Sequence, residues 1–110
     1  MICDFGDVAV VPFPFVDVTA EKRRPSLVLS HADFNSTHGH SVFAMITTAA
    51  GSQWPSDIKI QDFQDAGLNR PCVLRWKLFT LPNEFIIRRA GALAAGDRNN
   101  VAIAAHAIMA

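Results

Sequence analysis

The sequence predicts a mainly β fold with α, in which a small barrel of strands carries one C-terminal helix. Short apolar runs succeed one another at close spacing, separated by turn-forming residues, as is typical of small all-β domains. Only the last segment, 100–109, is rich in alanine with apolar residues at helical spacing. The chain has 110 residues, of which 50% are apolar, so residues 1–110 are expected to form one domain with its own core.

The first strand is expected at residues 8–15, after the turn signal Gly6-Asp7. Pro12 and Pro14 stand two residues apart in this run. Proline has no amide hydrogen to donate to a sheet, so the second half of the strand should lie at an edge or leave the sheet.

The remaining strands are expected where β-branched and other apolar residues cluster. These runs are 26–30, 42–48, 58–60, 72–81 and a part of 85–93. The run 42–48 is apolar enough to be a central strand. The polar segments 17–24, 31–40 and 62–70 are predicted to be loops, and 82–84 to be a turn or a single turn of helix.

The closing helix is predicted to run over residues 100–109, after a stop at Gly96 and an N-cap at Asp97. It is apolar on nearly all sides, whereas a small barrel covers only one face of a helix. Apolar residues such as Ile103 and Met109 would then remain in water. Exposed apolar surface of that size usually marks an interface, so we expect a homodimer.

The charge balance limits the kinds of partner. The net charge is zero and the pI is about 6.9, so the field of the whole molecule is not expected to attract polyanions. Asp4 and Asp7 interrupt any apolar export segment, and no run is long enough to span a bilayer. Cys3 and Cys72 lie far apart in the chain. We expect a cytoplasmic protein with reduced thiols, and a disulfide between the two stays open.

Three consecutive cations, Lys22, Arg23 and Arg24, stand directly before Pro25 at the start of a predicted strand. Runs of charge are most often solvated loops, and that interpretation stays open. The planar fork of arginine can also bind two phosphate oxygens at once, and the rigid Pro25 restricts the backbone that follows Arg24. We therefore expect these cations, and Arg24 above all, to face a phosphate.

The stretch "GDVAVVPFPF" followed by "KRRPSLVLS" resembles the MazF/PemK family of toxins from bacterial toxin–antitoxin pairs. The resemblance continues through "ADFN" and "ITT", and more weakly through "VLRWKLFTLP" and the closing helix. It implies a small SH3-like barrel of the CcdB/PemK type and a homodimer. It also implies a metal-independent endoribonuclease that cuts single-stranded RNA at short sequences, and a partly disordered antitoxin that holds the toxin inactive.

The resemblance also implies which residues act. Arg24 matches the family's arginine before proline, and Thr47 matches its threonine at the end of the third strand. Arg75 matches an arginine that some PemK-type members carry on the later strand. Those members place a carboxylate two residues further on, where this chain has Lys77. Further RNA contacts are expected from Lys22, Arg23 and Lys77, and from Trp54, which could stack on a base or cap the core.

Metal-free RNA cleavage uses the neighbouring 2′-hydroxyl as nucleophile and leaves a 2′,3′-cyclic phosphate. It needs a proton acceptor and a group that stabilises the added negative charge. With Lys77 at the carboxylate position, the base is open. It could be Arg24 or Arg75, although a guanidinium is nearly always protonated, or there could be no base at all. It could also be a histidine, which titrates near neutrality; the candidates are His31, His38 and His40.

The resemblance implies no cofactor and no metal, and the pair His38 and His40 is a weak metal signal in a loop. Two other functions stay open. One is a non-catalytic poison of DNA gyrase, like CcdB, that acts through its terminal helix. The other is a catalytically silent member that only binds an antitoxin, which Lys77 would favour.

Overall fold

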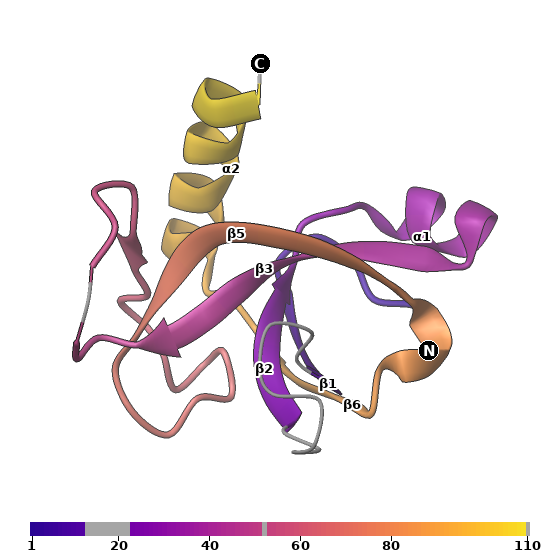
Figure 1. Ribbon diagram of the computed structural model, residues 1–110, viewed down its shortest axis with the longest axis horizontal. Coiled ribbons are helices and arrows are strands. Elements are labelled where there is room, and N and C mark those ends of the chain that lie inside the picture. Colours follow the sequence, from indigo (N-terminus) through magenta and orange to yellow (C-terminus); the bar gives the residue numbers. More distant parts are fainter. Residues whose placement is uncertain (13–22, 52, 110) are drawn as a thin grey trace.

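One curled sheet of six antiparallel strands organises the molecule, in the order β4-β5-β3-β2-β1-β6 (Figure 1). This computed structural model describes residues 1–12, 23–51 and 53–109. The strands are β1 Asp7–Pro12, β2 Arg23–Val28, β3 His40–Thr48, β4 Ile58–Lys59, β5 Cys72–Pro82 and β6 Arg88–Ala92. Helix α1 is Ala32–His38, α2 is Ala95–Met109, and a 3₁₀ turn, η1, is Asn83–Phe85. The predicted mainly β class with a C-terminal helix is confirmed.

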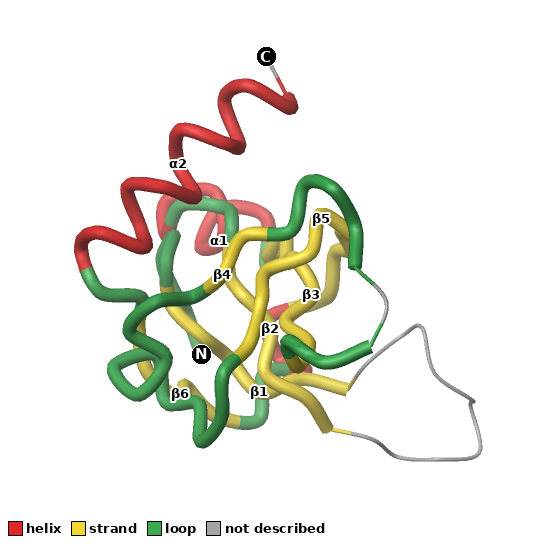
Figure 2. Tube along the Cα trace, turned by 90° about the vertical axis from the view of Figure 1, so that its left-hand side faces the viewer, coloured by secondary structure: helices red, strands yellow, loops and turns green. Residues whose placement is uncertain are grey.

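The sheet forms a half-barrel because its two long central strands, β3 and β5, bend as they cross the molecule (Figures 1 and 2). The pairing of β3 with β5 shifts register between Ala44 and Met45, where two extra residues of β5 are accommodated. Such a bulge increases the local twist and bends the strand. The run 42–48 is central, as its apolar composition predicts, since β3 lies between β2 and β5.

The core is divided between the two faces of the sheet. The larger cluster includes Leu27, Ala44 and Leu74, and Val101 of α2 closes it. The smaller cluster lies on what we call the Phe43 face, after its largest fully buried side chain. Because side chains alternate along a strand, every second residue of β2 and β3 points toward this Phe43 face.

The end of β1 agrees with the proline argument. The pairing of β1 with β6 ends at Val10, and Pro12 pairs only with Arg23 of β2. The missing amide hydrogen of Pro12 therefore costs no sheet hydrogen bond on the β6 side. Pro14 and the rest of the predicted strand lie outside the described residues.

The prediction of a loop over 31–40 is wrong, because residues 32–38 form helix α1. Asparagine, serine and glycine in this segment are turn formers in isolation. In the folded chain the Asp4 carboxylate accepts a hydrogen bond from the Ala32 amide, and Gly39 ends the helix in the left-handed conformation, with φ of 66°. Tertiary contacts thus supply the cap that the helix lacks in its own sequence.

Two further boundaries differ from the sequence prediction. Strand β2 begins at Arg23, so Arg24 lies within the strand and not in the loop predicted over 17–24. Helix α2 begins at Ala95, so Asp97 is not its N-cap. The buried Asp97 carboxylate instead accepts the amide hydrogens of Gln61 and Asp62, at 3.0 and 2.8 Å. It joins the helix to the segment that follows β4.

Both cysteines are free and buried, so the disulfide that the sequence left open is not formed. The short strand near residue 58 and the single helical turn after β5 are confirmed as β4 and η1. No helix in the described part of the chain is long and apolar enough to cross a membrane.

Candidate functional site

A cavity of about 350 Å³ lies where β2 begins and β3 ends. Three arginines line it, Arg24 of β2, Arg70 of the segment before β5, and Arg88 of β6. Thr47 and Thr48 of β3 also line it. No aspartate or glutamate is among the described residues that line it. The cavity is therefore a local positive patch on a chain of zero net charge.

Arg24 and Thr47 line the cavity from two neighbouring strands, β2 and β3. Strand β2 pairs with β3 as far as Ser26 and Met45, and Arg24 and Thr47 each lie two residues beyond this pair. Both side chains are half-buried and both line the cavity. The two residues singled out in the sequence on separate motifs thus share one site.

The wall opposite these strands is fixed by a close backbone approach. Gly67 has φ of 78°, and a Cβ atom there would lie 2.2 Å from the carbonyl oxygen of Ala90 in β6. Only glycine allows the segment to pack this tightly against the sheet. The packing holds the following residues, including Asn69 and Arg70, along the cavity.

Adjacent arginines on β6 have different roles. Arg89 forms an ion pair with Asp7 of β1, at 3.0 Å. Arg88 alternates to the other side of the strand and lines the cavity. Of these two, only Arg88 lies at the site.

Arg70 and Asn69 are site residues that the sequence interpretation missed. They follow Gly67 in a segment that reads as an ordinary polar loop. The glycine was the only local signal, since a positive φ is required where backbone packs against backbone. Their position at the cavity depends on contacts between residues far apart in the chain.

Arg75 does not line the cavity. Its side chain is 9% exposed and pairs with Asp57, which is equally buried, through Nε at 3.1 Å and a terminal nitrogen at 2.8 Å. The hydrogen bonds from Arg75 hold the pKa of the Asp57 carboxyl below its usual value, and the carboxylate raises the pKa of Arg75 in turn. Asp57 is a partner that the sequence analysis did not identify.

The other predicted RNA contacts are scattered. Lys22 lies outside the described residues. Arg23 is exposed at the start of β2, and Lys77 is half-buried on β5. Trp54 is 41% exposed on the segment between β3 and β4, with its ring over the Arg75 guanidinium. Neither Trp54 nor Lys77 lines the cavity.

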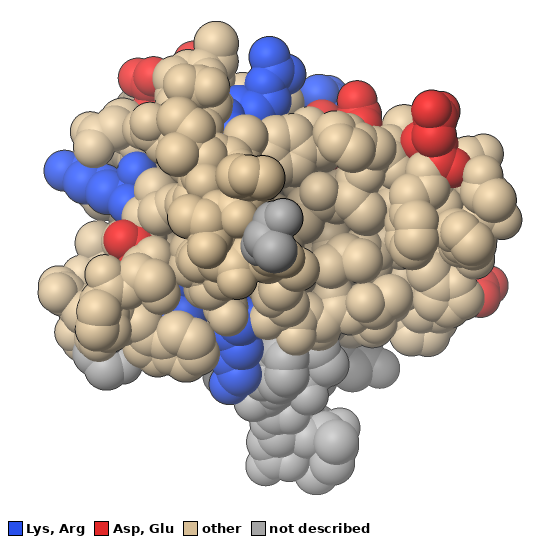
Figure 3. Space-filling model, turned by 90° about the horizontal axis from the view of Figure 1, so that it is seen from above, with Lys and Arg blue, Asp and Glu red and all other residues tan. Residues whose placement is uncertain are grey.

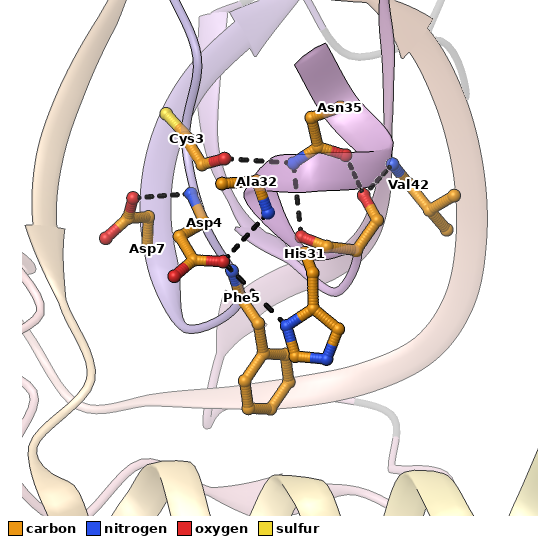
Figure 4. A network of polar contacts seen from close by, with 9 residues as sticks. Cys3, Asp4, Phe5, Asp7, His31, Ala32, Asn35 and Val42 are labelled. Carbon is orange, nitrogen blue, oxygen red and sulfur yellow. Dashed lines mark hydrogen bonds and ion pairs between the residues drawn. The ribbon is translucent and has the colours of Figure 1, made fainter. Parts of the chain in front are cut away.

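The histidine candidates lie at the opposite end of the sheet. His40 begins β3, whereas Thr47 is seven residues further along, which in a strand is about 23 Å. His38 ends α1, next to His40. His31 lies beside Asp4, with Nδ1 3.8 Å from its carboxylate, in the network that anchors α1 (Figure 4). Within one chain, the hypothesis of a histidine base at the cavity is therefore wrong.

No group of three or more histidine, cysteine or acidic side chains in the described residues is placed to hold a metal ion. What the cavity offers is guanidinium groups and hydroxyls, which are hydrogen-bond donors to an anion. Arginines that line a cavity suit a phosphodiester, since a guanidinium group can donate two parallel hydrogen bonds to phosphate oxygens.

Comparison with known proteins gives a consistent result. Residues 4–109 match the family model described as PemK-like, MazF-like toxin of type II toxin–antitoxin system. No curated protein is significantly similar to the sequence. MazF from Deinococcus radiodurans has a TM-score of 0.75 at 19% identity, over 99% of this chain and 97% of that chain. An endoribonuclease from Mycobacterial species, in complex with its cognate antitoxin, has a TM-score of 0.75 at 19% identity, over 96% of this chain and 94% of that chain. The Mycobacterium tuberculosis toxin MazF-mt6 has a TM-score of 0.66 at 24% identity, over 93% of this chain and 95% of that chain.

Proposed function

The chain belongs to the PemK-like, MazF-like toxins of type II toxin–antitoxin systems, and we propose that it is a metal-independent endoribonuclease. Its substrate is single-stranded RNA, cut at short sequences to leave a 2′,3′-cyclic phosphate. The observation that carries this proposal is the cavity that Arg24 and Thr47 line together with Arg70 and Arg88.

The residues at the cavity suit the charge that develops during cleavage. Attack of the 2′-hydroxyl on phosphorus adds negative charge to the non-bridging oxygens. The Arg24 guanidinium can bind two of these oxygens and stays protonated throughout. The Thr47 hydroxyl can donate a third hydrogen bond to the same group. Arg70 and Arg88 are then left for the neighbouring phosphates, which fix the strand in the cavity.

No carboxylate among the described residues lines the cavity, and Lys77 stands at the position where a family base is expected. The three histidine candidates, His31, His38 and His40, lie too far from the cavity in the same chain to replace it. Two of the three options for the base therefore remain, an arginine or none. In either case, most of the rate enhancement comes from positioning and from electrostatic stabilisation by the arginines.

Cleavage of single-stranded RNA by purified protein in the presence of EDTA tests the proposal. Arg24→Ala should lower the cleavage rate by about 100-fold or more, as expected when a donor to the transition state is lost. Thr47→Ala should lower it less, since it removes a neutral donor. Arg98→Ala on α2 removes the same charge at an exposed place away from the cavity and should cut at the parent rate.

Two results would contradict the assignment. If Arg24→Ala folds and cuts as fast as the parent, the cavity is not the active site. If the parent itself leaves every RNA intact, the chain is a silent or purely binding member of its family.

The proposed partners follow from the same surface. The toxin acts in the cytoplasm as a homodimer, and an acidic, partly disordered antitoxin tail competes with RNA for the cations of the cavity. The structure of the mycobacterial endoribonuclease with its cognate antitoxin supports a protein partner for this fold. The exposed apolar side chains of α2, such as Ile103 and Met109, support the dimer.

A further inference from the structure

Asp57 organises a small rigid unit next to the candidate site. Its carboxylate accepts the Trp54 amide hydrogen at 3.0 Å, and its own amide donates to the Trp54 carbonyl at 3.0 Å. The same carboxylate takes two hydrogen bonds from Arg75 of β5. One buried carboxylate therefore closes the turn 54–57 and fastens it to the central part of the sheet.

This unit holds an indole ring at the surface. The Arg75 guanidinium carbon lies 5.4 Å from the centroid of the Trp54 ring, a cation–π distance. Trp54 remains 41% exposed, although Arg75 beneath it is buried. A large aromatic side chain fixed on one face and open to solvent on the other loses little conformational entropy when something stacks on it.

The unit lies near the scissile position of the proposed reaction. Arg75 pairs with Met45 across β3 and β5, and Val73 pairs with Thr47 in the same register. Arg75 and Thr47 therefore share the Phe43 face, with Cα atoms about 8 Å apart from strand rise and strand spacing. Figure 2 shows the β3–β4 segment projecting on the side of the sheet away from the start of α2. A nucleotide next to a phosphate held by Thr47 has its base within reach of this segment.

We propose that Trp54 is a stacking platform for one unpaired base of the RNA, and that Arg75 and Asp57 are positioning residues that hold it. The inference rests on the proposed RNA substrate and replaces the expectation that Arg75 itself is catalytic. Stacking on an aromatic face accepts any base. The platform therefore contributes affinity and register, while base selection is left to hydrogen bonds made elsewhere.

The first test measures binding of a short 2′-O-methyl RNA of mixed sequence, which lacks the attacking hydroxyl and cannot be cut. Trp54→Ala should weaken binding by about 5-fold to 100-fold, the range for loss of one stacked base, and Trp54→Phe by less. Phe34→Ala removes another exposed aromatic, on α1, and should bind like the parent. Tryptophan emission should be quenched by RNA in the parent and lose most of that change in Trp54→Phe.

Salt dependence separates stacking from phosphate contact. The slope of log Kd against log salt should be the same in Trp54→Ala as in the parent, because no phosphate contact is lost. Arg24→Ala should make this slope shallower by about the amount that one phosphate contact contributes. An unchanged Kd for Trp54→Ala, or a shallower slope, would overturn the platform.

For the positioning role of Asp57, the expected change in RNA affinity is opposite to the change that charge alone would cause. Asp57→Asn removes a negative charge, so charge alone would strengthen RNA binding. The platform requires weaker binding instead, since Trp54 is no longer held. In a Trp54→Ala background, the loss caused by Asp57→Asn should disappear, as measured in a double-mutant cycle. Tighter binding by Asp57→Asn alone, or equal losses in both backgrounds, would contradict the positioning role.

The two proposals can fail separately. If the parent cuts RNA and Trp54→Ala binds and cuts normally, the platform is wrong and the nuclease assignment stands. If Trp54→Ala weakens binding of the uncut RNA while the parent never cleaves the cleavable one, the nuclease assignment is wrong and the platform stands. A parent that binds an acidic peptide but no RNA would overturn the platform.

Discussion

Asn35 shows at the scale of a single residue how a polar side chain can hold distant segments together. Its buried amide donates to the carbonyl oxygens of Cys3 and Ser30 and accepts from the Ser30 hydroxyl (Figure 4). Its own carbonyl accepts from the Asn83 amide at 2.7 Å. The N-terminus, α1 and η1 meet at this one residue.

Replacing Asn35 should therefore be costly. Asn35→Ala leaves buried carbonyl groups without partners, which should lower the free energy of unfolding by about 3 kcal/mol. For a chain of this size that corresponds to a fall in Tm of about 15 °C, measurable by circular dichroism. Asn100→Ala, at an exposed position of α2, should leave Tm within a few degrees of the parent. A parent-like Tm for Asn35→Ala would show that the network adds little.

Carboxylates join several elements of this fold to segments far away in the chain. Asp57 fastens the β3–β4 segment to β5, and Asp97 fastens α2 to the segment after β4. The exposed Asp4 carboxylate makes a similar link, since it accepts the Ala32 amide hydrogen at the start of α1. These links explain why local propensity misplaced α1 and the start of α2, because each boundary is set by a partner far away in the sequence.

The Asp57–Arg75 link should make stability depend on pH in a defined direction. The folded state lowers the pKa of the Asp57 carboxyl, so its contribution is complete above the unfolded value of about 3.9 and is lost as pH falls through the lower folded value. Asp57→Asn should thus lower Tm at pH 7, and the difference from the parent should shrink below about pH 4. Asp65→Asn, at an exposed position, controls for the charge. A gap in Tm that persists unchanged to pH 2 would exclude the ion pair as its cause.

The whole molecule exposes one side of α2. Only Asp97 and Val101 of this helix are buried, while Ile103, Ile108 and Met109 are 62%, 49% and 58% exposed. Figure 1 shows the helix standing away from the sheet, and Figure 3, which looks down on its C-terminal end, shows few charged side chains around it. Such a surface is typical of an interface, and the proposed homodimer would cover it.

Ile103→Glu should weaken this homodimer, because it places a charge in an apolar contact. Sedimentation over a range of concentrations should show a dimer for the parent and a shift toward monomer for the variant. Asn100→Glu adds the same charge at a polar position of α2 and should leave the dimer intact. A parent that sediments as a monomer at every concentration would rule the homodimer out.

The sequence by itself determined the class of fold and most of the strands. Apolar alternation, proline positions and glycine turns are local signals, and each reports on a few neighbouring residues. The same local motifs singled out Arg24 and Thr47 on separate strands. Local motifs were not sufficient to show that α1 is helical. The turn preference of its residues is overcome by contacts with residues elsewhere in the chain.

Only the tertiary structure decided which side chains meet. It placed Arg70 and Arg88 beside Arg24, moved Arg75 away from the cavity, and paired it with Asp57, eighteen residues earlier in the chain. It also separated His40 from Thr47 by most of the length of β3. These outcomes depend on strand register and on how loops fold back over the sheet. Both are set by contacts between distant residues, and no local pattern of residues encodes them.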